Sequence, residues 1–283
     1  MGDAQPIDGG QAALWNGLAG RGWVEAQALT DKTYQPLEDL LVDAVAAVSR
    51  GAVLDVGCGT GRTTIAVARR LGLDSRCTGV DISEPMIAAA RARVERDGTR
   101  AQFIRADAQD YPFEPASVDT IMSRFGVMFF DDPVRAFANL RRAGTDDAAL
   151  RCITWRPAAE NPFMTTAERA AAPLLPNLPP RRPDGPGQFA FADDRRVHRI
   201  LEDAGWTDID IRPIDVVCAL PEKDLVVYLT RLGPVGLILQ EADERTRARV
   251  VEAVRPAFDR YVDGTDVRFT AACWMVEARG GPR

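Results

Sequence analysis

The sequence holds one histidine, and none of its five cysteines stands in a C-x-x-C pair. The cysteine spacing therefore gives no sign of a zinc site or a redox-active dithiol, and we expect reduced, mostly buried thiols. No uncharged apolar stretch approaches the roughly 20 residues that a helix needs to cross a bilayer. Residues 1–10 are polar and lack the pattern of a secretory signal. We therefore expect a cytoplasmic protein with no membrane partner.

The chain also has fewer basic than acidic residues. Lys and Arg number 35 against 41 Asp and Glu, which gives a formal net charge of -6. Because nucleic-acid binding is driven largely by clustered basic side chains, this balance argues against a nucleic-acid partner. The composition, 46% hydrophobic and 27% charged, is typical of a globular protein with a full core.

Short apolar runs alternate with amphipathic segments through the first half of the chain. After a helical stretch that ends near residue 48, strands are predicted at 52–56, 77–80, 101–106, 118–123 and 150–155, with helices between them. Ser83-Glu84-Pro85 predicts a helix start with a hydroxyl cap. The alternation indicates an α/β protein with a mostly parallel sheet and helices on both faces, which binds ligands at the carboxyl ends of its strands.

The most informative segment is Val53-Leu54-Asp55-Val56-Gly57-Cys58-Gly59-Thr60-Gly61. Glycines at alternate positions of a strand-to-helix turn allow positive φ and let a ligand lie against the main chain. The helix that follows presents free N–H groups, which suit a carboxylate. A dinucleotide fingerprint would require a third glycine where this chain has Arg62, and it does not include Asp55. The pattern therefore points away from a nicotinamide cofactor.

With these residues the sequence resembles the class I S-adenosylmethionine-dependent methyltransferases, and among them the branch that includes quinone C-methyltransferases. The resemblance is clear over 43–155 and weak elsewhere. It implies a Rossmann-like, seven-stranded, mostly parallel sheet, S-adenosylmethionine as cofactor, S-adenosylhomocysteine as product, and no metal. The implied reaction is in-line transfer of a methyl group to oxygen, carbon or nitrogen of a small molecule.

The first motif of the resemblance is VLDVGCGTG. By analogy with the family, Asp55 would orient the methionyl end of the cofactor. Gly57, Cys58 and Gly59 would line the cofactor along the turn.

The second motif is GVDIS. Here the resemblance implies that Asp81 accepts hydrogen bonds from both ribose hydroxyls, while Ile82 and Met86 pack on the adenine. The alternative is that Asp81 only caps the helix that follows it.

The third motif, RADAQD, would place the Asp107 carboxylate on the adenine amino group and the Ala108 N–H on a ring nitrogen. Asp110 lies further into the loop and is the residue that could be mistaken for this anchor.

In the fourth motif, SRFGVMFF, the residues Ser123, Arg124 and Phe125 would pass beside the methionyl chain. We also hypothesise that an indole of the N-terminal segment, Trp15 or Trp23, covers the cofactor and faces its sulfonium. Trp23 is taken as the cofactor-binding candidate. The alternative is a helix that its tryptophans simply pack against the domain.

The acceptor side of the site is less defined. An oxygen or carbon acceptor would benefit from a base, and the single histidine, His198, is the candidate, with an ordinary helix-start histidine as the alternative. The proline-rich segment after residue 155 is predicted to be an inserted lid that forms the acceptor pocket. It offers arginines for an acidic acceptor and phenylalanines for an apolar one: Arg156, Arg181 and Arg182, or Phe163, Phe189 and Phe191.

The predicted organisation is an N-terminal helical cap over the cofactor at 1–36, a cofactor-binding core at 37–155, the lid at 156–196 and the rest of the α/β domain, with its last two strands, at 197–283. Two other functions stay open: a non-catalytic S-adenosylmethionine-binding regulator or assembly partner, and an NAD(P)-dependent oxidoreductase. A homodimer is an open alternative to the monomer.

Overall fold

The computed structural model describes residues 10–181 and 185–281. The strands are β1 (Ala52–Val56), β2 (Arg76–Asp81), β3 (Gln102–Arg105), β4 (Val118–Arg124), β5 (Gly144–Trp155), β6 (Trp206–Pro221), β7 (Val262–Asp263) and β8 (Asp266–Gly280). The α-helices are α1 (Gly10–Asn16), α2 (Leu18–Glu25), α3 (Gln27–Thr33), α4 (Gln35–Ala46), α5 (Arg62–Leu71), α6 (Glu84–Asp97), α7 (Pro133–Ala143), α8 (Pro162–Ala171), α9 (Asp194–Asp203), α10 (Leu225–Arg231), α11 (Gly233–Glu241) and α12 (Glu244–Val254).

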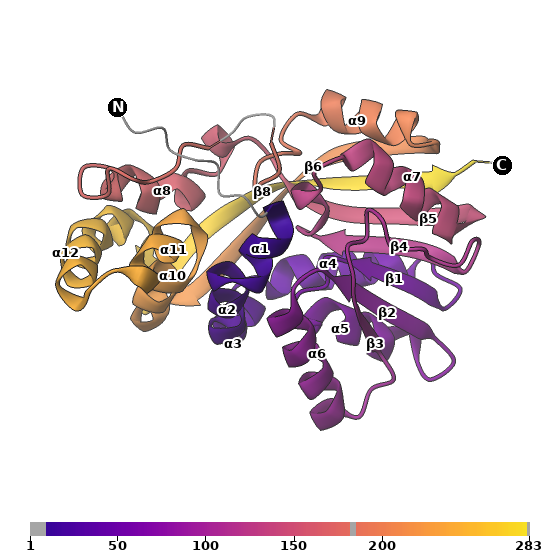
Figure 1. Cartoon of the computed structure of the whole chain (residues 1–283), viewed down its shortest axis with the longest axis horizontal. Helices are drawn as coiled ribbons and strands as arrows, with labels where there is room; N and C mark the ends of the chain where they lie inside the picture. The colour runs from indigo at the N-terminus through magenta and orange to yellow at the C-terminus, as the bar shows by residue number, and fades with distance from the viewer. Residues whose placement is uncertain (1–9, 182–184, 282–283) are drawn as a thin grey trace.

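One sheet runs through the molecule, with helices on both of its faces (Figure 1). Its strand order is β3-β2-β1-β4-β5-β8-β6, and the two-residue β7 pairs with β8 beside this path. Strands β1 to β5 are parallel, and β8 runs antiparallel between β5 and β6. The predicted Rossmann-like, mostly parallel sheet is confirmed, with β7 as an addition to the seven main strands.

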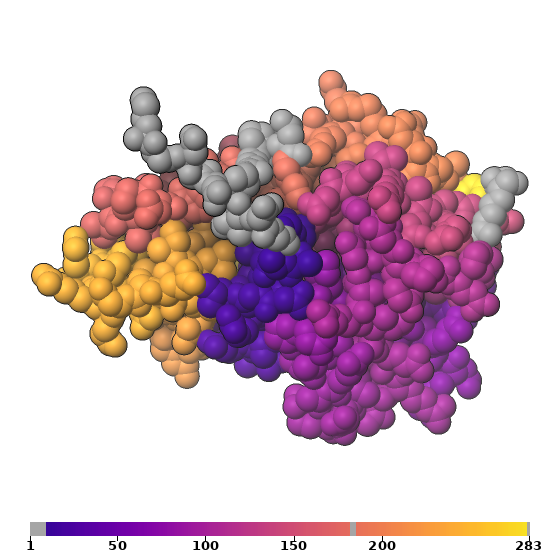
Figure 2. Space-filling model, in the orientation of Figure 1, coloured from indigo at the N-terminus to yellow at the C-terminus, as the bar shows by residue number. Residues whose placement is uncertain are grey.

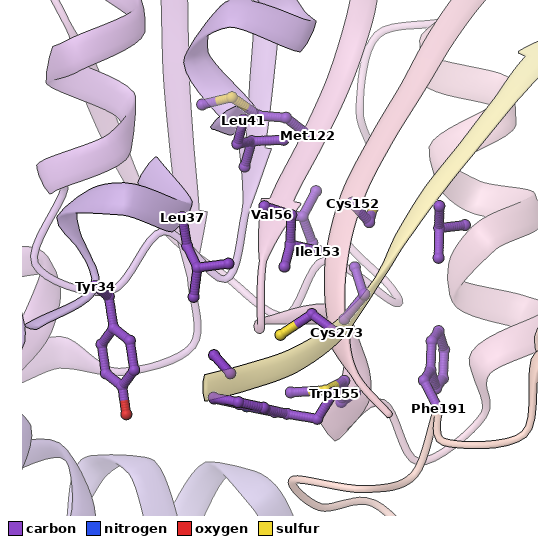
Figure 3. Close-up of a cluster of buried hydrophobic side chains, with 14 of the residues drawn as sticks. Tyr34, Leu37, Leu41, Val56, Met122, Cys152, Ile153, Trp155, Phe191 and Cys273 are labelled. Carbon is purple, nitrogen blue, oxygen red and sulfur yellow. The ribbon is translucent and has the colours of Figure 1, made fainter. Parts of the chain in front are cut away.

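The central strands are buried, polar side chains included. In β4 every residue except the terminal Arg124 is buried, which is typical of a parallel strand covered on both faces. Helix α7 is capped by Asp132, whose side chain accepts a hydrogen bond from the Arg135 N–H, and Pro133 fills its first position. Figure 3 shows Leu37 of α4 and Ile153 of β5 among the buried side chains of the core.

The start of α6 differs from the prediction. Ser83 does not cap this helix with its hydroxyl, because that hydroxyl donates to the carbonyl oxygen of Trp15 at 2.6 Å. The cap comes from Asn16 instead, whose Oδ1 accepts from the Glu84 N–H at 2.8 Å. The N-terminal segment thus completes a helix of the α/β core.

Helices α1 to α4 confirm the predicted helical N-terminus. Helix α2 contacts α6 on one side and both α10 and α11 on the other, and Figure 2 shows the indigo N-terminal surface in contact with the magenta core and the yellow-orange helices. Two ion pairs fix the N-terminal helices to the core: Arg93 to Asp31 at 2.6 Å and Arg62 to Glu38 at 3.0 Å. Both pairs include a largely buried side chain, so these helices are an integral part of the domain.

The second half of the chain extends the sheet. Strands β6 and β8 run past the parallel strands toward α8, α10, α11 and α12 (Figure 1). The proline-rich segment contains a ten-residue helix, α8, and buried Asn161 ties its base to β8: Asn161 Nδ2 donates to the Ala272 carbonyl at 2.9 Å, and the Ala272 N–H donates to Asn161 Oδ1 at 3.0 Å. Arg182 lies outside the described residues.

The cysteines of the described chain are free thiols, and four of them are buried. This confirms the expectation of reduced, mostly buried thiols. Within residues 10–181 and 185–281, no helix has the length and apolar character needed to cross a membrane.

Candidate active site

The turn between β1 and α5 has a backbone that only glycine adopts readily. Gly57, Gly59 and Gly61 have φ values of 66°, 56° and 78°. A Cβ on Gly57 would lie 2.5 Å from the Cα of Gly126, so the loops after β1 and β4 are in direct backbone contact. At Gly59 the nearest atom to such a Cβ would be the Met86 sulfur at 3.6 Å. The main chain at Gly59 therefore leaves room for a ligand, and Met86 flanks that room.

Cys58 turns its side chain away from this open face. A Cβ on Gly79 of β2 would lie 2.8 Å from the Cys58 sulfur, which shows that the thiol packs back against the sheet. Burial raises the pKa of this thiol well above its usual value. Cys58 thus contributes its backbone to the turn and no reactive thiolate.

Asp81, at the carboxyl end of β2, is held by two backbone groups. Its Oδ2 accepts from the Gly59 N–H at 2.8 Å and its Oδ1 accepts from the Ser83 N–H at 2.9 Å. Burial raises the pKa of Asp81, against the effect of these hydrogen bonds. Because each carboxylate oxygen can accept a further hydrogen bond, the side chain can serve two hydroxyl groups as well as the turn.

Asp55 lies on the floor of the turn and is 1% exposed. Burial raises the pKa of its carboxyl to about 7, while a hydrogen bond from Thr64 (2.6 Å) and the nearby Arg124 guanidinium act in the opposite direction. A carboxyl group that titrates near neutrality responds strongly to a nearby cation. It is therefore suited to an ammonium group such as that of an amino-acid ligand.

The two aspartates of the third motif lie in the loop after β3 and have different partners. Asp107 is exposed, and its Oδ1 accepts from the Gln109 N–H at 2.9 Å. Asp110 forms a surface ion pair with Arg135 at 2.5 Å. Ala108 is buried, and its carbonyl accepts from Asn139. The loop is thus held in place from α7, while Asp107 faces solvent.

Ser123 organises the turn after β4 from inside the protein. Its hydroxyl donates to the Val56 carbonyl at 2.7 Å and accepts from the Gly126 N–H at 3.1 Å. Arg124 donates to the Thr63 hydroxyl at 3.2 Å, and Phe125 has a positive φ of 69°. The structure therefore brings Arg124 and Phe125 to the carboxyl edge of the sheet, with Ser123 as the residue that fixes their turn.

The N-terminal helices reach the second motif through Trp15. Its ring meets Phe129 edge-on at a centroid distance of 4.9 Å, and Asn16 Nδ2 donates to the Ile82 carbonyl at 3.1 Å. Trp23 lies on α2, half-buried against the main core. Of the two indoles, Trp15 is therefore the one that lies beside the second motif, since its carbonyl also accepts from the Ser83 hydroxyl.

His198 lies on α9, which packs against α7 and β6 and lies beside α7 in Figure 1. Its Nδ1 is 3.2 Å from Glu202 Oε2, one helical turn away, and its side chain is 46% exposed. The structure therefore pairs this histidine with a neighbour on its own helix.

The sequence reasoning missed an aromatic cluster at the carboxyl ends of β4 and β5, formed by Tyr34, Phe125, Trp155 and Tyr228. Phe125 stacks on Trp155 with a centroid distance of 4.6 Å and an interplanar angle of 7°. Tyr34 meets both rings edge-on, at 5.9 Å and 6.3 Å. The members come from segments far apart in the chain, so no local sequence pattern could predict the cluster.

Other parts of the described chain are less suited to chemistry. A groove of about 380 Å³ lies on the outer side of α4 and α5, where its lining mixes arginines with carboxylates. Among residues 10–181 and 185–281, no group of three or more His, Cys, Asp or Glu side chains is placed to hold a metal ion.

Comparison with known proteins agrees with this geometry. Residues 53–146 match a family described as a methyltransferase domain. The demethylmenaquinone methyltransferase of Renibacterium salmoninarum is 26% identical over 212 residues, which cover 72% of this chain and 86% of that protein. The aklanonic acid methyltransferase DauC of a Streptomyces strain is 33% identical over 106 residues, 37% of this chain and 48% of that protein.

Among solved structures, a putative methyltransferase from Bacillus halodurans superimposes with a TM-score of 0.55 at 16% identity, over 85% of this chain and 97% of that one. This likeness concerns the fold. The matched methyltransferase domain and the demethylmenaquinone methyltransferase relatives support a class I S-adenosylmethionine-dependent methyltransferase that is similar to the quinone methyltransferases.

Proposed function

We propose that the protein methylates a small organic acceptor, and that the residues around the glycine turn hold the cofactor as the sequence motifs predict. The observation that carries this assignment is the Asp81 carboxylate, which the Gly59 and Ser83 N–H groups fix beside the open backbone at Gly59. The names of two relatives specify demethylmenaquinone and aklanonic acid. A small acceptor of this kind is therefore proposed here, with the methylated atom left to experiment.

The residues around the glycine turn suit each part of S-adenosylmethionine. Asp55 would attract the methionyl ammonium, and the bare backbone from Gly57 to Gly59 would lie along the ligand. Asp81 would bind the ribose, with Ile82 and Met86 beside the adenine. The exposed Asp107 carboxylate and the Ala108 N–H would meet the edge of the base.

When bound, S-adenosylmethionine supplies a sulfonium methyl group and a thioether leaving group that needs no proton. The protein therefore contributes mainly by orienting the two reactants, which can lower a barrier by as much as ~7–11 kcal/mol. Arg124 and Phe125 stand at the edge where the acceptor would approach. We propose that His198 takes no part, since its side chain is 46% exposed on α9, a helix that packs against α7 and β6.

We further propose that residues 1–36 form the cap over the cofactor and that 156–196 borders the acceptor. In support of the cap, Trp15 and Asn16 bond to the loop that carries Asp81 and Ile82. In support of the second assignment, Phe163 of α8 stacks on Phe269 of β8. Cytoplasmic location, the absence of nucleic-acid and membrane partners, and a homodimer stay predictions.

Calorimetry with S-adenosylhomocysteine tests the cofactor assignment. In Asp81→Asn the new NH₂ group would replace one of the two carboxylate oxygens, so one of the backbone N–H groups of Gly59 and Ser83 would lose its acceptor. The ribose would also lose a charged acceptor. Hydrogen bonds to charged groups contribute ~1.5–3 kcal/mol each, so we expect a loss of affinity of about 100-fold. Asp110→Asn, on the surface with Arg135, is the matched control and should stay within about twofold.

Catalysis is tested separately, by the release of S-adenosylhomocysteine from S-adenosylmethionine with a demethylmenaquinol preparation and with a small-molecule cell extract. Product formed in either case supports a methyltransferase. Cofactor binding without turnover in both would favour the non-catalytic regulator. No heat with S-adenosylhomocysteine would overturn the cofactor assignment itself.

A further inference from the structure

The first turn of α5 presents a buried hydroxyl group to the floor of the glycine turn. Thr64 is fully buried, and its Oγ1 donates to Asp55 Oδ2 at 2.6 Å. Asp55 is buried as well, so the bond joins two polar groups that are shielded from water. Such a bond contributes more than a bond at the surface, because the carboxyl group has no solvent to replace a lost donor.

Asp55 has the weakest set of partners among three carboxylates around the turn. The Glu38 carboxylate accepts from Arg62 Nε at 3.0 Å and 3.2 Å. The Asp81 carboxylate accepts from two backbone N–H groups. Among the residues that the structure describes, Asp55 accepts from the Thr64 hydroxyl alone. A single neutral donor therefore holds the carboxyl group that is proposed to meet the methionyl ammonium.

The bond determines how the Asp55 carboxyl group is turned and how readily it ionises. Because the Thr64 hydroxyl binds Oδ2, it keeps Oδ1 available for a ligand. Burial raises the pKa of Asp55 to about 7, and the hydrogen bond from Thr64 acts against this rise because it stabilises the ionised form. Without the hydroxyl, Asp55 should stay neutral up to a higher pH.

The other groups near Asp55 do not replace the hydroxyl. The Arg124 charge favours the ionised form of Asp55, but Arg124 Nε donates to the Thr63 hydroxyl at 3.2 Å and not to Asp55. The charges of Asp81 and Glu38 disfavour the ionised form. Three thiols close to Asp55 keep their protons, because burial raises the pKa of each: Cys58, Cys77 and Cys152. The hydroxyl on α5 can therefore be removed without a change in the charge around the site.

We propose that Thr64 is a positioning residue, whose hydroxyl orients the Asp55 carboxyl group for the cofactor and sets the pH range over which the cofactor binds. This inference rests on the proposed methyltransferase function and adds a residue that regulates its cofactor site. Because Thr64 is fully buried, it acts through Asp55. It lies three residues beyond the first motif, so the motif itself does not include it.

The test measures the S-adenosylhomocysteine affinity of the whole protein by calorimetry from about pH 5.5 to 8.5. Affinity should rise as Asp55 ionises. In Thr64→Val the midpoint of this rise should move up by about one pH unit, because the ionised form loses a hydrogen bond. Affinity should then be about tenfold lower than in the unmodified protein at about pH 6.5, and nearly restored at about pH 8.5. Thr64→Ser keeps the hydroxyl and should leave the midpoint in place.

Thr120→Val is the matched control. Thr120 is also fully buried, and its hydroxyl donates to Asp119 at 2.7 Å. Asp119 accepts from the N–H groups of Arg50 and Ala52, at the opposite end of β1 from the glycine turn. The control therefore loses a comparable bond and should keep the midpoint of the unmodified protein. An equal shift in the control would show that a general loss of stability moves the midpoint, and would overturn the inference.

A measurement without ligand separates this inference from the cofactor assignment. Because burial raises the pKa of Asp55 to about 7, its contribution to the unfolding free energy should fall as pH rises and level off above that pKa. Urea denaturation, compared with the same protein carrying Asp55→Asn, isolates this fall. Its end should lie about one pH unit higher in Thr64→Val. If S-adenosylhomocysteine did not bind, the cofactor assignment would fail, while this measurement would still decide the role of Thr64.

A second pair of variants keeps the test decisive if Thr64→Val folds poorly. Thr64→Ala and Thr64→Ser differ by the hydroxyl alone, so the midpoint should be about one pH unit higher in Thr64→Ala. The inference would be overturned by an unchanged midpoint in Thr64→Val, or by equal midpoints in Thr64→Ala and Thr64→Ser.

Discussion

The cofactor half and the acceptor half of the site are built in different ways. The groups proposed for the cofactor lie in short turns directly after β1, β2, β3 and β4, and many of them are backbone groups. The aromatic side chains at the acceptor edge come from the α3–α4 junction, the end of β5 and the residue after β4, and are brought together only by packing. Turns fixed by glycine geometry resist change, whereas a side-chain cluster can be altered one residue at a time. This division lets one fold keep its cofactor while its acceptor varies.

The largest expected effect lies in the cofactor half, in the contrast between Gly57 and Gly59. Both have positive φ, so alanine at either position costs roughly 1–2 kcal/mol of unfolding free energy. At Gly57 the new Cβ would also lie 2.5 Å from the Gly126 Cα, and such overpacking adds about 1–3 kcal/mol. Urea denaturation of the ligand-free protein should therefore show Gly57→Ala as clearly the less stable variant.

Gly59→Ala should instead affect ligand binding more than stability. Its Cβ would meet no protein atom closer than 3.6 Å, yet it would stand on the face where the ligand is proposed to lie. We expect it to lose S-adenosylhomocysteine affinity while keeping most of the stability. Equal loss of stability in the two variants would contradict the view that Gly57 is needed for a backbone contact and Gly59 for a ligand contact.

The next effect concerns pH and Asp55. Burial raises the pKa of this carboxyl to about 7, so in the free protein it binds a proton more tightly than in the unfolded chain, and its contribution to stability falls as pH rises toward 7. A ligand ammonium would favour the ionised form. Affinity for S-adenosylhomocysteine should therefore rise with pH by up to about tenfold per unit below pH 7 and level off above it.

Calorimetry between about pH 5.5 and 8 measures this dependence, and Asp55→Asn should remove most of it. A slope that persists unchanged in Asp55→Asn would show that another group binds the proton, and would take Asp55 out of the methionyl site.

The same division explains what the sequence could predict. The bounds of β1 follow from an apolar run that ends at a glycine turn, both local features, and the structure agrees with the predicted 52–56. The cap of α6 was predicted wrongly because the Ser83 hydroxyl finds a partner in Trp15, a contact that only tertiary structure creates. Tyr34 and Tyr228 could not be predicted at all, since a buried tyrosine in a helical segment looks like any other core residue.

The smallest expected effect tests whether the two halves are coupled. Helix α2 lies between them: a Cβ on Gly20 would lie 2.7 Å from the Ser83 hydroxyl, and one on Gly22 would lie 2.4 Å from the Arg231 carbonyl. An ion pair from Glu25 to Arg231, at 2.9 Å, supplements this packing. Its side chains are 52% and 40% exposed, and such pairs contribute at most about 1 kcal/mol.

Glu25→Gln should therefore lower the unfolding free energy by less than about 1 kcal/mol and leave the affinities for S-adenosylhomocysteine and demethylmenaquinol within about twofold. High salt should remove the remaining difference, because it screens exposed charges. If Glu25→Gln changed one affinity by more than this, and only when the other ligand was bound, then α2 would couple the two halves energetically. The cofactor and acceptor sites would then have to be treated as a single cooperative unit.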